Sequence, residues 1–242
     1  MEFISRFTAV ILTLVLSPLL IGISICNLLL QGRPIIFRQK RIGKNFKPFI
    51  IYKFRSMENK SPSLNSYQIG KNEGITRWGR FLRKTKLDEL PQFINVIKGD
   101  MRFIGPRPEV PEFVNEDSFF FLKEIKPGLS GYSSILFRNE SEIWSMIDSK
   151  DPYKNILRIK IALDKYYVNK KSFIQDLKLV GITILSLFIP KRMGHYLIIK
   201  LLKIKNDGEF GLKEEIDNVK IKEPNIKIDE EPTKRNLRIL FL

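Results

Sequence analysis

The sequence predicts an α+β protein that is mainly helical, with an N-terminal re-entrant membrane helix followed by a small domain of short strands and interfacial amphipathic helices. Three observations lead to this fold class. The run from Phe7 to Leu30 holds 24 residues without a charge. From residue 33 the chain mixes apolar and basic residues as half-exposed strands do, and beyond residue 76 the apolar spacing becomes helical. The chain carries a net charge of +16.

Length, charge and cysteine content limit the classes of protein that fit. The 242 residues suffice for one or two globular units. Residues 1–205 hold 35 basic and 17 acidic side chains, a net charge of +18. This part therefore suits an anionic partner, which charge alone leaves open between nucleic acid, an anionic bilayer surface and a phosphorylated substrate. A single cysteine, Cys26, and a single histidine, His195, exclude disulfide scaffolds and zinc modules.

The apolar N-terminal run is long enough to cross a bilayer core of about 30 Å as one helix. Ser17-Pro18 lies near its centre, where proline removes a helical hydrogen bond and the serine hydroxyl can satisfy a freed carbonyl. The run alone favours a plain transmembrane helix with a kink. The flanks favour a re-entrant hairpin, because eight basic residues between positions 33 and 55 belong in the cytoplasm and Arg6 would then lie on the same side. The run is too long for a secretory signal peptide.

The segment after this run predicts short strands and then a loop. Residues 33–57 form a strand-like hairpin, with turns at Gly43 and Pro48 and a strand from Phe49 to Phe54. Residues 58–75 are rich in Ser, Asn and Gly and have no period, so we expect a loop there.

Helical spacing returns between Thr76 and Lys98. Pro91 does not suit a helix interior, so we expect a new helix whose first turn holds Asp88 to Pro91 and which ends at Gly99. The pair Asp88-Glu89 then lies at the positive end of a helix, among basic side chains. This position lowers carboxylate pKa values and keeps both groups charged, as a nucleophile or a ligand of Mg²⁺ must be. The alternative is that Asp88 is only an N-cap and Glu89 only complements the helix dipole.

A stiff turn follows the acidic pair. Gly105, Pro106 and Pro108 present Arg107 with little conformational freedom, which suits a bidentate phosphate clamp. The alternative is a rigid connector with a solvated arginine. Near the C-terminus, residues 178–189 predict a core or interfacial helix, residues 191–205 a basic amphipathic stretch, and residues 206–242 a flexible charged tail.

Four separated stretches together resemble one known family. They are FRQKRIGKNFKPFIIYKFRSM (37–57), KTKLDELPQFINVIKGDMRFIGPRPEV (84–110), IKPGLSGYSSILFRNE (125–140) and LDKYYVNKKSFIQDLKLV (163–180). In order and spacing the chain is similar to the bacterial sugar transferase family, the monotopic polyprenyl-phosphate phosphoglycosyl transferases, over roughly residues 1–190. The resemblance implies three domains: a re-entrant membrane hairpin at 1–32, a catalytic domain at 33–205 and the tail at 206–242.

The resemblance also implies roles for particular residues. Ser17 and Pro18 would break the re-entrant helix, Asp88 would be the nucleophile, and Glu89 would assist it in binding Mg²⁺. Arg107 matches the family's phosphate-contacting arginine. The basic residues that we expect to join it in binding substrate phosphates are Arg80, Arg83, Lys53 and Arg55.

The expected reaction is the transfer of a sugar-1-phosphate from a nucleoside diphosphate sugar, most simply a UDP-sugar, to polyprenyl (undecaprenyl) phosphate through an aspartyl-phosphosugar. It would begin a bacterial surface glycan. The family implies Mg²⁺ as cofactor, a lipid bilayer as partner and no nucleic acid, with the catalytic domain on the cytosolic face of the bacterial inner membrane. A homodimer, the sugar and the glycan stay open.

The chain departs from the family pattern at a few positions. Lys86 and Arg102 stand where small polar residues such as serine are common, Thr8 where an acidic residue is common, and Tyr132-Ser133-Ser134 replaces a Trp-Ala-Gln-like stretch. Two other functions compete with catalysis. A membrane-tethered binder of nucleic acid or anionic lipid would explain the charge but lacks a recognisable nucleic-acid motif. A non-catalytic scaffold of the same fold is opposed by the intact acidic pair and Arg107.

Overall fold

The computed structural model describes residues 2–58, 74–138 and 151–188. The chain divides into two compact units, Met1–Leu129 and Ser130–Leu242. Most of the expected loop at 58–75, the stretch 191–205 with His195, and the tail 206–242 lie outside the described residues. The domain boundaries expected at residues 32 and 205 therefore stay predictions.

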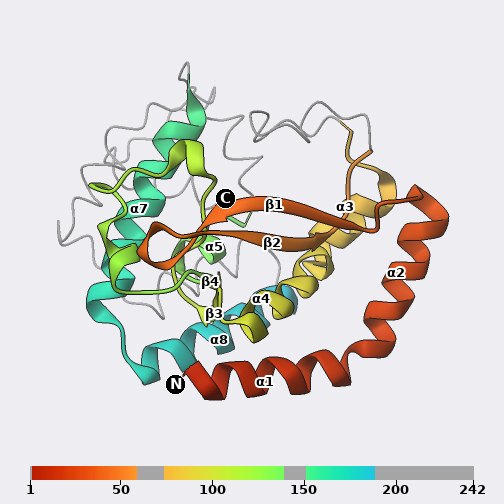
Figure 1. Cartoon of the computed structure of the whole chain (residues 1–242), viewed down its shortest axis with the longest axis horizontal. Coiled ribbons are helices and arrows are strands. Elements are labelled where there is room, and N and C mark those ends of the chain that lie inside the picture. Colours follow the sequence, from red (N-terminus) through yellow and green to blue (C-terminus); the bar gives the residue numbers. More distant parts are fainter. Residues whose placement is uncertain (1, 59–73, 139–150, 189–242) are drawn as a thin grey trace, which may run out of the picture. The chain divides into compact units, whose positions relative to one another are not determined.

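The N-terminal run forms two helices with a sharp break between them. Helix α1 spans Glu2–Val15 and α2 spans Ser17–Gln31, and the two meet at a bend of 63° (Figure 1). Pro18 lies in the first turn of α2, where its missing N–H leaves no helical bond unmade. The Ser17 hydroxyl donates to the Leu14 carbonyl at 2.7 Å. The predicted break at Ser17-Pro18 is confirmed.

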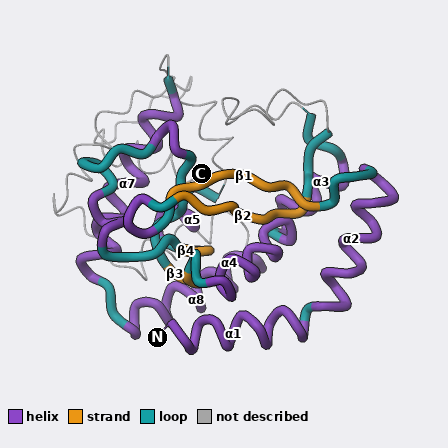
Figure 2. Tube along the Cα trace, viewed as in Figure 1, coloured by secondary structure: helices purple, strands orange, loops and turns teal. Residues whose placement is uncertain are grey.

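The predicted hairpin is present. Strands β1 (Ile36–Ile42) and β2 (Pro48–Phe54) pair antiparallel, from Ile36 opposite Phe54 to Ile42 opposite Pro48 (Figure 2). A short 3-10 helix, Lys44–Phe46, lies in the turn between them.

Helix α3 (Arg77–Thr85) begins at Thr76, whose side chain accepts a hydrogen bond from the Gly79 N–H, as an N-cap does. It ends at Lys86, which adopts a left-handed conformation with φ of 60°. A 3-10 helix, Leu87–Gln92, and then α4 (Phe93–Lys98) follow. The predicted helix start near Asp88 is therefore a 3-10 turn, and α4 ends at Gly99 as predicted, with φ of 83°.

The rest of the first unit is mostly irregular. Strand β3 (Arg102–Ile104) pairs with β4 (Gly128–Ser130). Between them lie two 3-10 helices, Pro111–Phe113 and Phe120–Lys123.

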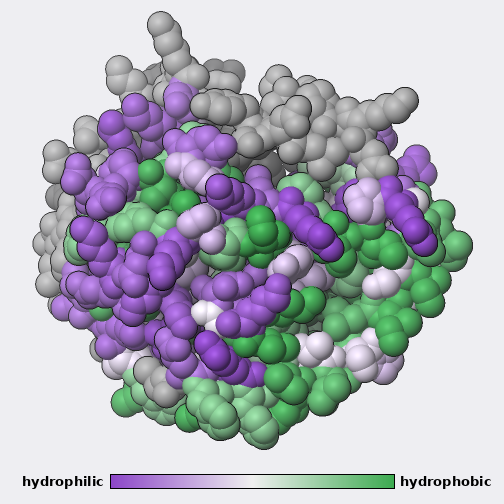
Figure 3. All heavy atoms as spheres, in the orientation of Figure 1, coloured by the Kyte–Doolittle hydropathy of each residue, from purple (hydrophilic) through white to green (hydrophobic). Residues whose placement is uncertain are grey.

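Both N-terminal helices pack on the same unit. Ala9 of α1 belongs to a buried cluster with Ile51 of β2, Val96 of α4 and Met101. Ile23 of α2 belongs to a second cluster with Phe54 of β2 and Leu82 of α3. The outer sides of α1 and α2 carry exposed apolar side chains, for example Phe3 (80% exposed), Phe7 (58%) and Leu29 (77%), and Figure 3 shows hydrophobic residues gathered over both helices.

The second unit is helical in its described part. It contains α5 (Tyr132–Leu136), α7 (Pro152–Lys170) and α8 (Phe173–Phe188). Tyr132 packs edge-on against Tyr166 and Tyr167. Helix α8 agrees with the helix expected at 178–189, although it begins earlier.

Candidate active site

Three segments of the first unit carry the predicted site. Lys53 lies on β2, Asp88 and Glu89 lie in the 3-10 helix, and Arg107 lies in the turn after β3. The left-handed conformation at Lys86 ends α3 and begins the 3-10 helix, so the acidic pair follows directly on a reversal of the chain. Lys53 precedes Asp88 by 35 positions in the sequence, and Arg107 follows later still. The contacts described below bring these residues to one place.

Glu89 is held by two cations. Its Oε1 lies 2.8 Å from Lys53 Nζ and 3.0 Å from Arg107 Nη2. All three side chains are shielded, with exposed fractions of 12% for Glu89, 17% for Lys53 and 25% for Arg107. Ion pairs of this kind are strengthened by partial exclusion of water, so the clamp fixes both cations beside the acidic pair.

Asp88 is in a different situation from its neighbour. The residue is only 7% exposed, and its Oδ1 is buried with no hydrogen-bond partner among the described residues. A buried carboxylate oxygen without a partner is costly and calls for an explanation. An oxygen kept free for a cation or a phosphorus atom is the explanation that fits an active site.

The two carboxyl groups have opposite pKa shifts. Burial and the charge of Glu89 raise the pKa of Asp88, against the opposing charges of Lys53, Lys86 and Arg83. Burial also acts to raise the pKa of Glu89, but the charges of Lys53, Arg107 and Lys86 outweigh it and hold that pKa well below its usual value. The expectation of lowered pKa values is thus confirmed for Glu89 and wrong for Asp88, because two adjacent carboxylates share one set of cations and only Glu89 is in direct contact with them.

The structure places the other predicted phosphate-binding residues differently. Arg83 Nε donates to Ser56 Oγ at 2.8 Å, and its charge acts on both Asp88 and Glu89. Arg80 lies on the exposed side of α3, and nothing in the described part of the chain places its side chain at the acidic pair.

Arg55 serves another part of the fold. The residue is 3% exposed. Its guanidinium donates to the carbonyls of Gln31, Gly32 and Arg33. These carbonyls lie at and after the end of α2, where a cation is favoured by the helix dipole. Arg55 therefore fastens α2 to the hairpin, and a role in substrate binding stays a prediction.

Sequence reasoning did not single out Gln92. This residue is 1% exposed, ends the 3-10 helix that carries the acidic pair, and has a buried Nε2 without a partner among the described residues. Nothing in the apolar spacing of residues 87–98 marks position 92, so its burial could not be predicted from the sequence.

The acidic pair supplies two of the oxygen ligands that a hard divalent cation needs. In the described residues no group of three or more His, Cys, Asp and Glu side chains could hold a metal ion. Asp88 and Glu89 offer two carboxylates, and the free Oδ1 of Asp88 is an oxygen ligand of the kind that Mg²⁺ takes. Mg²⁺ commonly completes such a site with water and substrate phosphates, so the residues present fit it.

The N-terminal helices differ in bilayer-spanning length when taken singly and as a pair. Among the described helices, none is long and apolar enough by itself to cross a bilayer. The bent pair of α1 and α2, taken together, has the length and the apolar composition that a bilayer-spanning segment needs.

Proteins from other bacteria are similar in sequence to this chain. A relative from Aeromonas hydrophila, named UDP-N-acetylgalactosamine-undecaprenyl-phosphate N-acetylgalactosaminephosphotransferase, is 37% identical over 182 residues, which cover 73% of this chain and 40% of the relative. The UDP-glucose:undecaprenyl-phosphate glucose-1-phosphate transferase of Escherichia coli (strain K12) is 32% identical over 190 residues, 76% of this chain and 39% of the relative.

A third relative, from Bacillus subtilis (strain 168), is named an uncharacterised sugar transferase and is 33% identical over 187 residues, 76% of this chain and 85% of the relative. The chain thus spans less than half the length of the first two relatives and most of the third. The sequence model of the family described as bacterial sugar transferase matches residues 2–190. This chain therefore belongs to the bacterial sugar transferase family.

Proposed function

We propose that the protein transfers a sugar-1-phosphate from a nucleoside diphosphate sugar to a polyprenyl phosphate, and so begins the assembly of a bacterial surface glycan. One observation carries the proposal. A buried carboxylate oxygen of Asp88, which has no hydrogen-bond partner within residues 2–58, 74–138 and 151–188, lies next to a carboxylate, Glu89, that two cations hold. Family membership supports it, since two relatives are named as transferases that act on undecaprenyl phosphate.

The transfer proceeds in two displacements at phosphorus. In the first, an Asp88 carboxylate oxygen attacks the sugar-linked phosphorus, the bond to the bridging oxygen breaks, and the nucleoside monophosphate leaves. An acyl phosphate between Asp88 and the sugar phosphate remains. In the second, a phosphate oxygen of the polyprenyl phosphate attacks the same phosphorus and the Asp88 carboxylate leaves. Covalent catalysis of this kind lets one site meet a soluble donor and a lipid acceptor in turn.

The surrounding cations stabilise the charge that develops. Lys53 and Arg107 point their nitrogens at Glu89, so they are preorganised beside the position that the transferred phosphoryl group takes. Preorganised cations of this kind stabilise a phosphoryl-transfer transition state. Mg²⁺, held by Asp88 and Glu89 together with the donor phosphates, would supply further neutralisation of phosphate charge.

The helix pair α1 and α2 anchors the protein as a re-entrant hairpin in the bacterial inner membrane, with the catalytic unit on the cytosolic face. Three observations support this: the bend of 63°, the exposed apolar sides of both helices, and basic residues on both flanks of the run. A short anchor of this form keeps Asp88 at the level of the acceptor's phosphate, so that the lipid need not leave the bilayer.

A UDP-sugar is the donor that the relatives favour, because their names include UDP-N-acetylgalactosamine and UDP-glucose. The decisive experiment measures nucleotide release by the detergent-solubilised full chain. The reaction contains Mg²⁺, undecaprenyl phosphate and one of a panel of UDP-, GDP- and CDP-sugars. Intact-mass spectrometry without the acceptor then tests for an adduct with the mass of one sugar phosphate.

The matched controls are Asp88→Asn and Asp117→Asn, since Asp117 is an exposed aspartate of the same unit. We expect release with at least one donor, an adduct in the native chain and in Asp117→Asn, and neither in Asp88→Asn. Release without an adduct would contradict the covalent step. A folded protein that binds nucleotide and releases none with any donor would favour a non-catalytic scaffold.

A further inference from the structure

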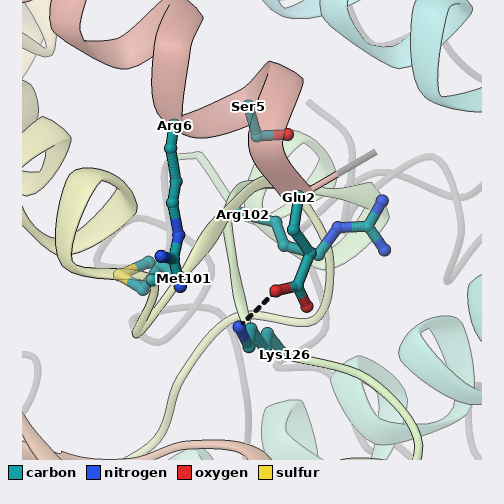
Figure 4. Close-up of a pocket in the computed structure, with 7 residues that line it drawn as sticks. Glu2, Ser5, Arg6, Met101, Arg102 and Lys126 are labelled. Carbon is teal, nitrogen blue, oxygen red and sulfur yellow. Dashed lines mark hydrogen bonds and ion pairs between the residues drawn. The ribbon is translucent and has the colours of Figure 1, made fainter.

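The turn that presents Arg107 is attached to the fold on both of its sides, by different kinds of contact. On the side that precedes it, the Arg102 N–H at the start of β3 donates to the Pro127 carbonyl at 2.8 Å. The neighbouring Lys126 pairs with Glu2 of α1, with 2.8 Å between Nζ and Oε2, and Figure 4 shows this pair. These contacts hold the chain before the turn, so the contacts after Arg107 decide where its guanidinium lies.

Arg41 of β1 holds the two residues that follow Arg107. Its Nη1 donates to the Pro108 carbonyl at 3.2 Å and lies 3.3 Å from Glu109 Oε2, with which it forms an ion pair. The backbone adds a further contact, because the Ile42 N–H donates to the Glu109 carbonyl at 3.0 Å. The chain after Arg107 is thus attached to β1 through a side chain and through the main chain.

The Arg41 guanidinium is itself held in one orientation. Its Nη2 donates to Gln39 Oε1 at 2.6 Å, and the side chains of Arg41 and Glu109 are only 16% and 6% exposed. An ion pair that is partly shielded from water is stronger than one at the surface. The planar fork of donors in an arginine is preorganised for several acceptors at once, whereas a lysine keeps the charge and loses the fork. The site therefore requires arginine and not only a positive charge.

The register of the hairpin relates Arg41 to the acidic pair. Lys53 of β2 lies opposite Phe37, which precedes Arg41 by four positions on β1. Residues opposite each other in an antiparallel pair share a face of the sheet, as do residues two positions apart on one strand. Arg41 and Lys53 therefore lie on the same face, about 13 Å apart along the strands at about 3.3 Å per residue. One hairpin thus holds Glu89 through Lys53 and the segment of Arg107 through Arg41.

We propose that Arg41 is a positioning residue for the transfer reaction and that it acts through Arg107. By holding residues 108 and 109, it fixes the Arg107 guanidinium beside Glu89 and at a set distance from Lys53. A cation stabilises the charge that develops on a phosphoryl group only as far as it is placed there in advance. The inference rests on the function proposed above, because the placement of Arg107 affects a rate only where the transfer takes place.

The variant Arg41→Lys tests this role. Removal of the charge, as in Arg41→Gln, would leave the buried Glu109 carboxylate without this cation and would destabilise the fold strongly. The matched control is Arg38→Lys, the same replacement at an exposed position of β1 on the opposite face of the hairpin. Melting curves of the detergent-solubilised full chain select a temperature at which both variants are folded.

Steady-state nucleotide release with Mg²⁺, undecaprenyl phosphate and the donor that the panel above identifies gives kcat and KM. We expect Arg41→Lys to lower kcat about tenfold, less than the loss of about 10²-fold that a misplacement near 1 Å can cause, because the charge remains. KM for the donor should stay within about twofold, since the interaction lost is one made in the transition state. Arg38→Lys should leave both constants within about twofold.

A double-mutant cycle tests whether Arg41 acts through Arg107. Two residues that act as one unit have effects that do not add. In an Arg107→Gln background, Arg41→Lys should therefore lower kcat by less than about twofold. A further tenfold loss in that background would show that Arg41 acts independently of Arg107, and the proposal would be overturned.

A second readout does not depend on turnover. In a chain that contains isotope-labelled arginine, the side-chain Nε–H signal of Arg107 is identified by its loss in Arg107→Lys, and its heteronuclear NOE reports motion on the picosecond to nanosecond scale. We expect a lower NOE for this signal in Arg41→Lys and an unchanged NOE in Arg38→Lys. An unchanged Arg107 signal in Arg41→Lys would overturn the proposal whatever the value of kcat.

The same signal separates the failure of this inference from the failure of the function proposed above. If the native chain releases no nucleotide with any donor while the Arg107 signal still changes in Arg41→Lys, the transfer is refuted and the link from Arg41 to Arg107 stands. If the native chain releases nucleotide and neither kcat nor the Arg107 signal changes in Arg41→Lys, the transfer stands and the positioning role is refuted.

Discussion

Trp78 Nε1 donates a hydrogen bond to Asn27 Oδ1 at 2.6 Å, which joins α3 to α2. Asn27 is fully buried, and its Nδ2 donates to the carbonyls of Ile35 and Arg55 at 3.2 and 3.1 Å. Its Oδ1 also accepts a bond from Gln31 Nε2 at 2.9 Å. One amide side chain in a mainly apolar helix thus binds α2, α3 and the hairpin ends together.

Replacement of Asn27 by leucine should destabilise the protein by about 2–3 kcal/mol, since it leaves the buried Trp78 N–H without its acceptor and removes one of the two hydrogen bonds that each of the Ile35 and Arg55 carbonyls accepts. Thermal denaturation of the detergent-solubilised chain measures this loss. Thr8→Leu, at an exposed position of α1, is the control and should change stability by less than about 0.5 kcal/mol. Equal melting curves for both variants would show that the network does not hold α2 in place.

Arg55 provides a test that separates a structural role from substrate binding. Its guanidinium donates to Gly32 O at 2.8 Å and to Arg33 O at 2.9 Å, and a lysine keeps the charge but loses the fork of donors. We expect Arg55→Lys to lower the melting temperature while KM for the nucleotide sugar stays within about twofold at a temperature where the variant is folded. A raised KM with an unchanged melting curve would instead return Arg55 to the substrate site.

The helices, strands and turns of the chain could largely be predicted from the sequence, whereas the contacts between residues far apart in the sequence could not. The apolar run, the Ser17-Pro18 break, the hairpin at 33–57 and the helix end at Gly99 all follow from periodicity and from glycine and proline chemistry, and the structure confirms them. Each depends on residues within a few positions of one another.

The division of labour between Asp88 and Glu89 depends on contacts across the fold. Only the folded chain shows that Lys53 and Arg107 both reach Glu89, while Asp88 is buried and its Oδ1 has no hydrogen-bond partner in the described part of the chain. The role of Arg55 could not be predicted either. The sequence around a basic residue at the end of a strand is the same whether its side chain contacts a phosphate or the end of a helix. Asn27 was hidden within the apolar run of residues 7–30, and no sequence pattern marked Gln92.

The opposite pKa shifts of the acidic pair predict opposite effects on stability. The pKa of Asp88 is raised in the folded state, so its charged form destabilises the fold. This destabilisation is absent below the pKa of an unfolded aspartate, about 3.9. It reaches its full size above the pKa of Asp88 in the folded state. The pKa of Glu89 is lowered, so its charge stabilises the fold above its unfolded pKa, and that stability is lost as pH falls through the folded pKa.

At pH 7, Asp88→Asn should therefore raise the melting temperature and Glu89→Gln should lower it. The melting temperature should change by about 2–4 °C for every kcal/mol of change in the free energy of unfolding. The difference for Asp88→Asn should shrink toward pH 4, where Asp88 of the native chain takes up a proton, whereas the difference for Glu89→Gln should largely persist there, because the folded pKa of Glu89 lies well below its usual value. Melting curves at the two pH values in the absence of divalent cations measure this, and nucleotide release should be abolished in Asp88→Asn although the protein is more stable. If Asp88→Asn melts at a lower temperature than the native chain at pH 7, the charge on Asp88 does not destabilise the folded state.

The turn that carries Arg107 rests on a close approach of two glycines. A Cβ at Gly128 would lie 2.1 Å from Gly105 N and 2.6 Å from Gly105 Cα, and the Gly128 N–H donates to the Pro106 carbonyl at 2.8 Å. Because backbone atoms meet on both sides, no side chain can move to make room. An alanine at position 128 must therefore push the turn, and Arg107 with it, away from Glu89.

We expect Gly128→Ala to lower kcat by about 10²-fold, the loss that a displacement near 1 Å of a positioned group can cause, with a smaller effect on donor binding. The control is Gly22→Ala on α2, where a Cβ has no neighbour within 4 Å, and where alanine should keep full activity and favour the helix. Steady-state nucleotide release, with melting curves to select a temperature at which both variants are folded, compares the two. Full activity in Gly128→Ala would mean that the position of Arg107 does not depend on this contact.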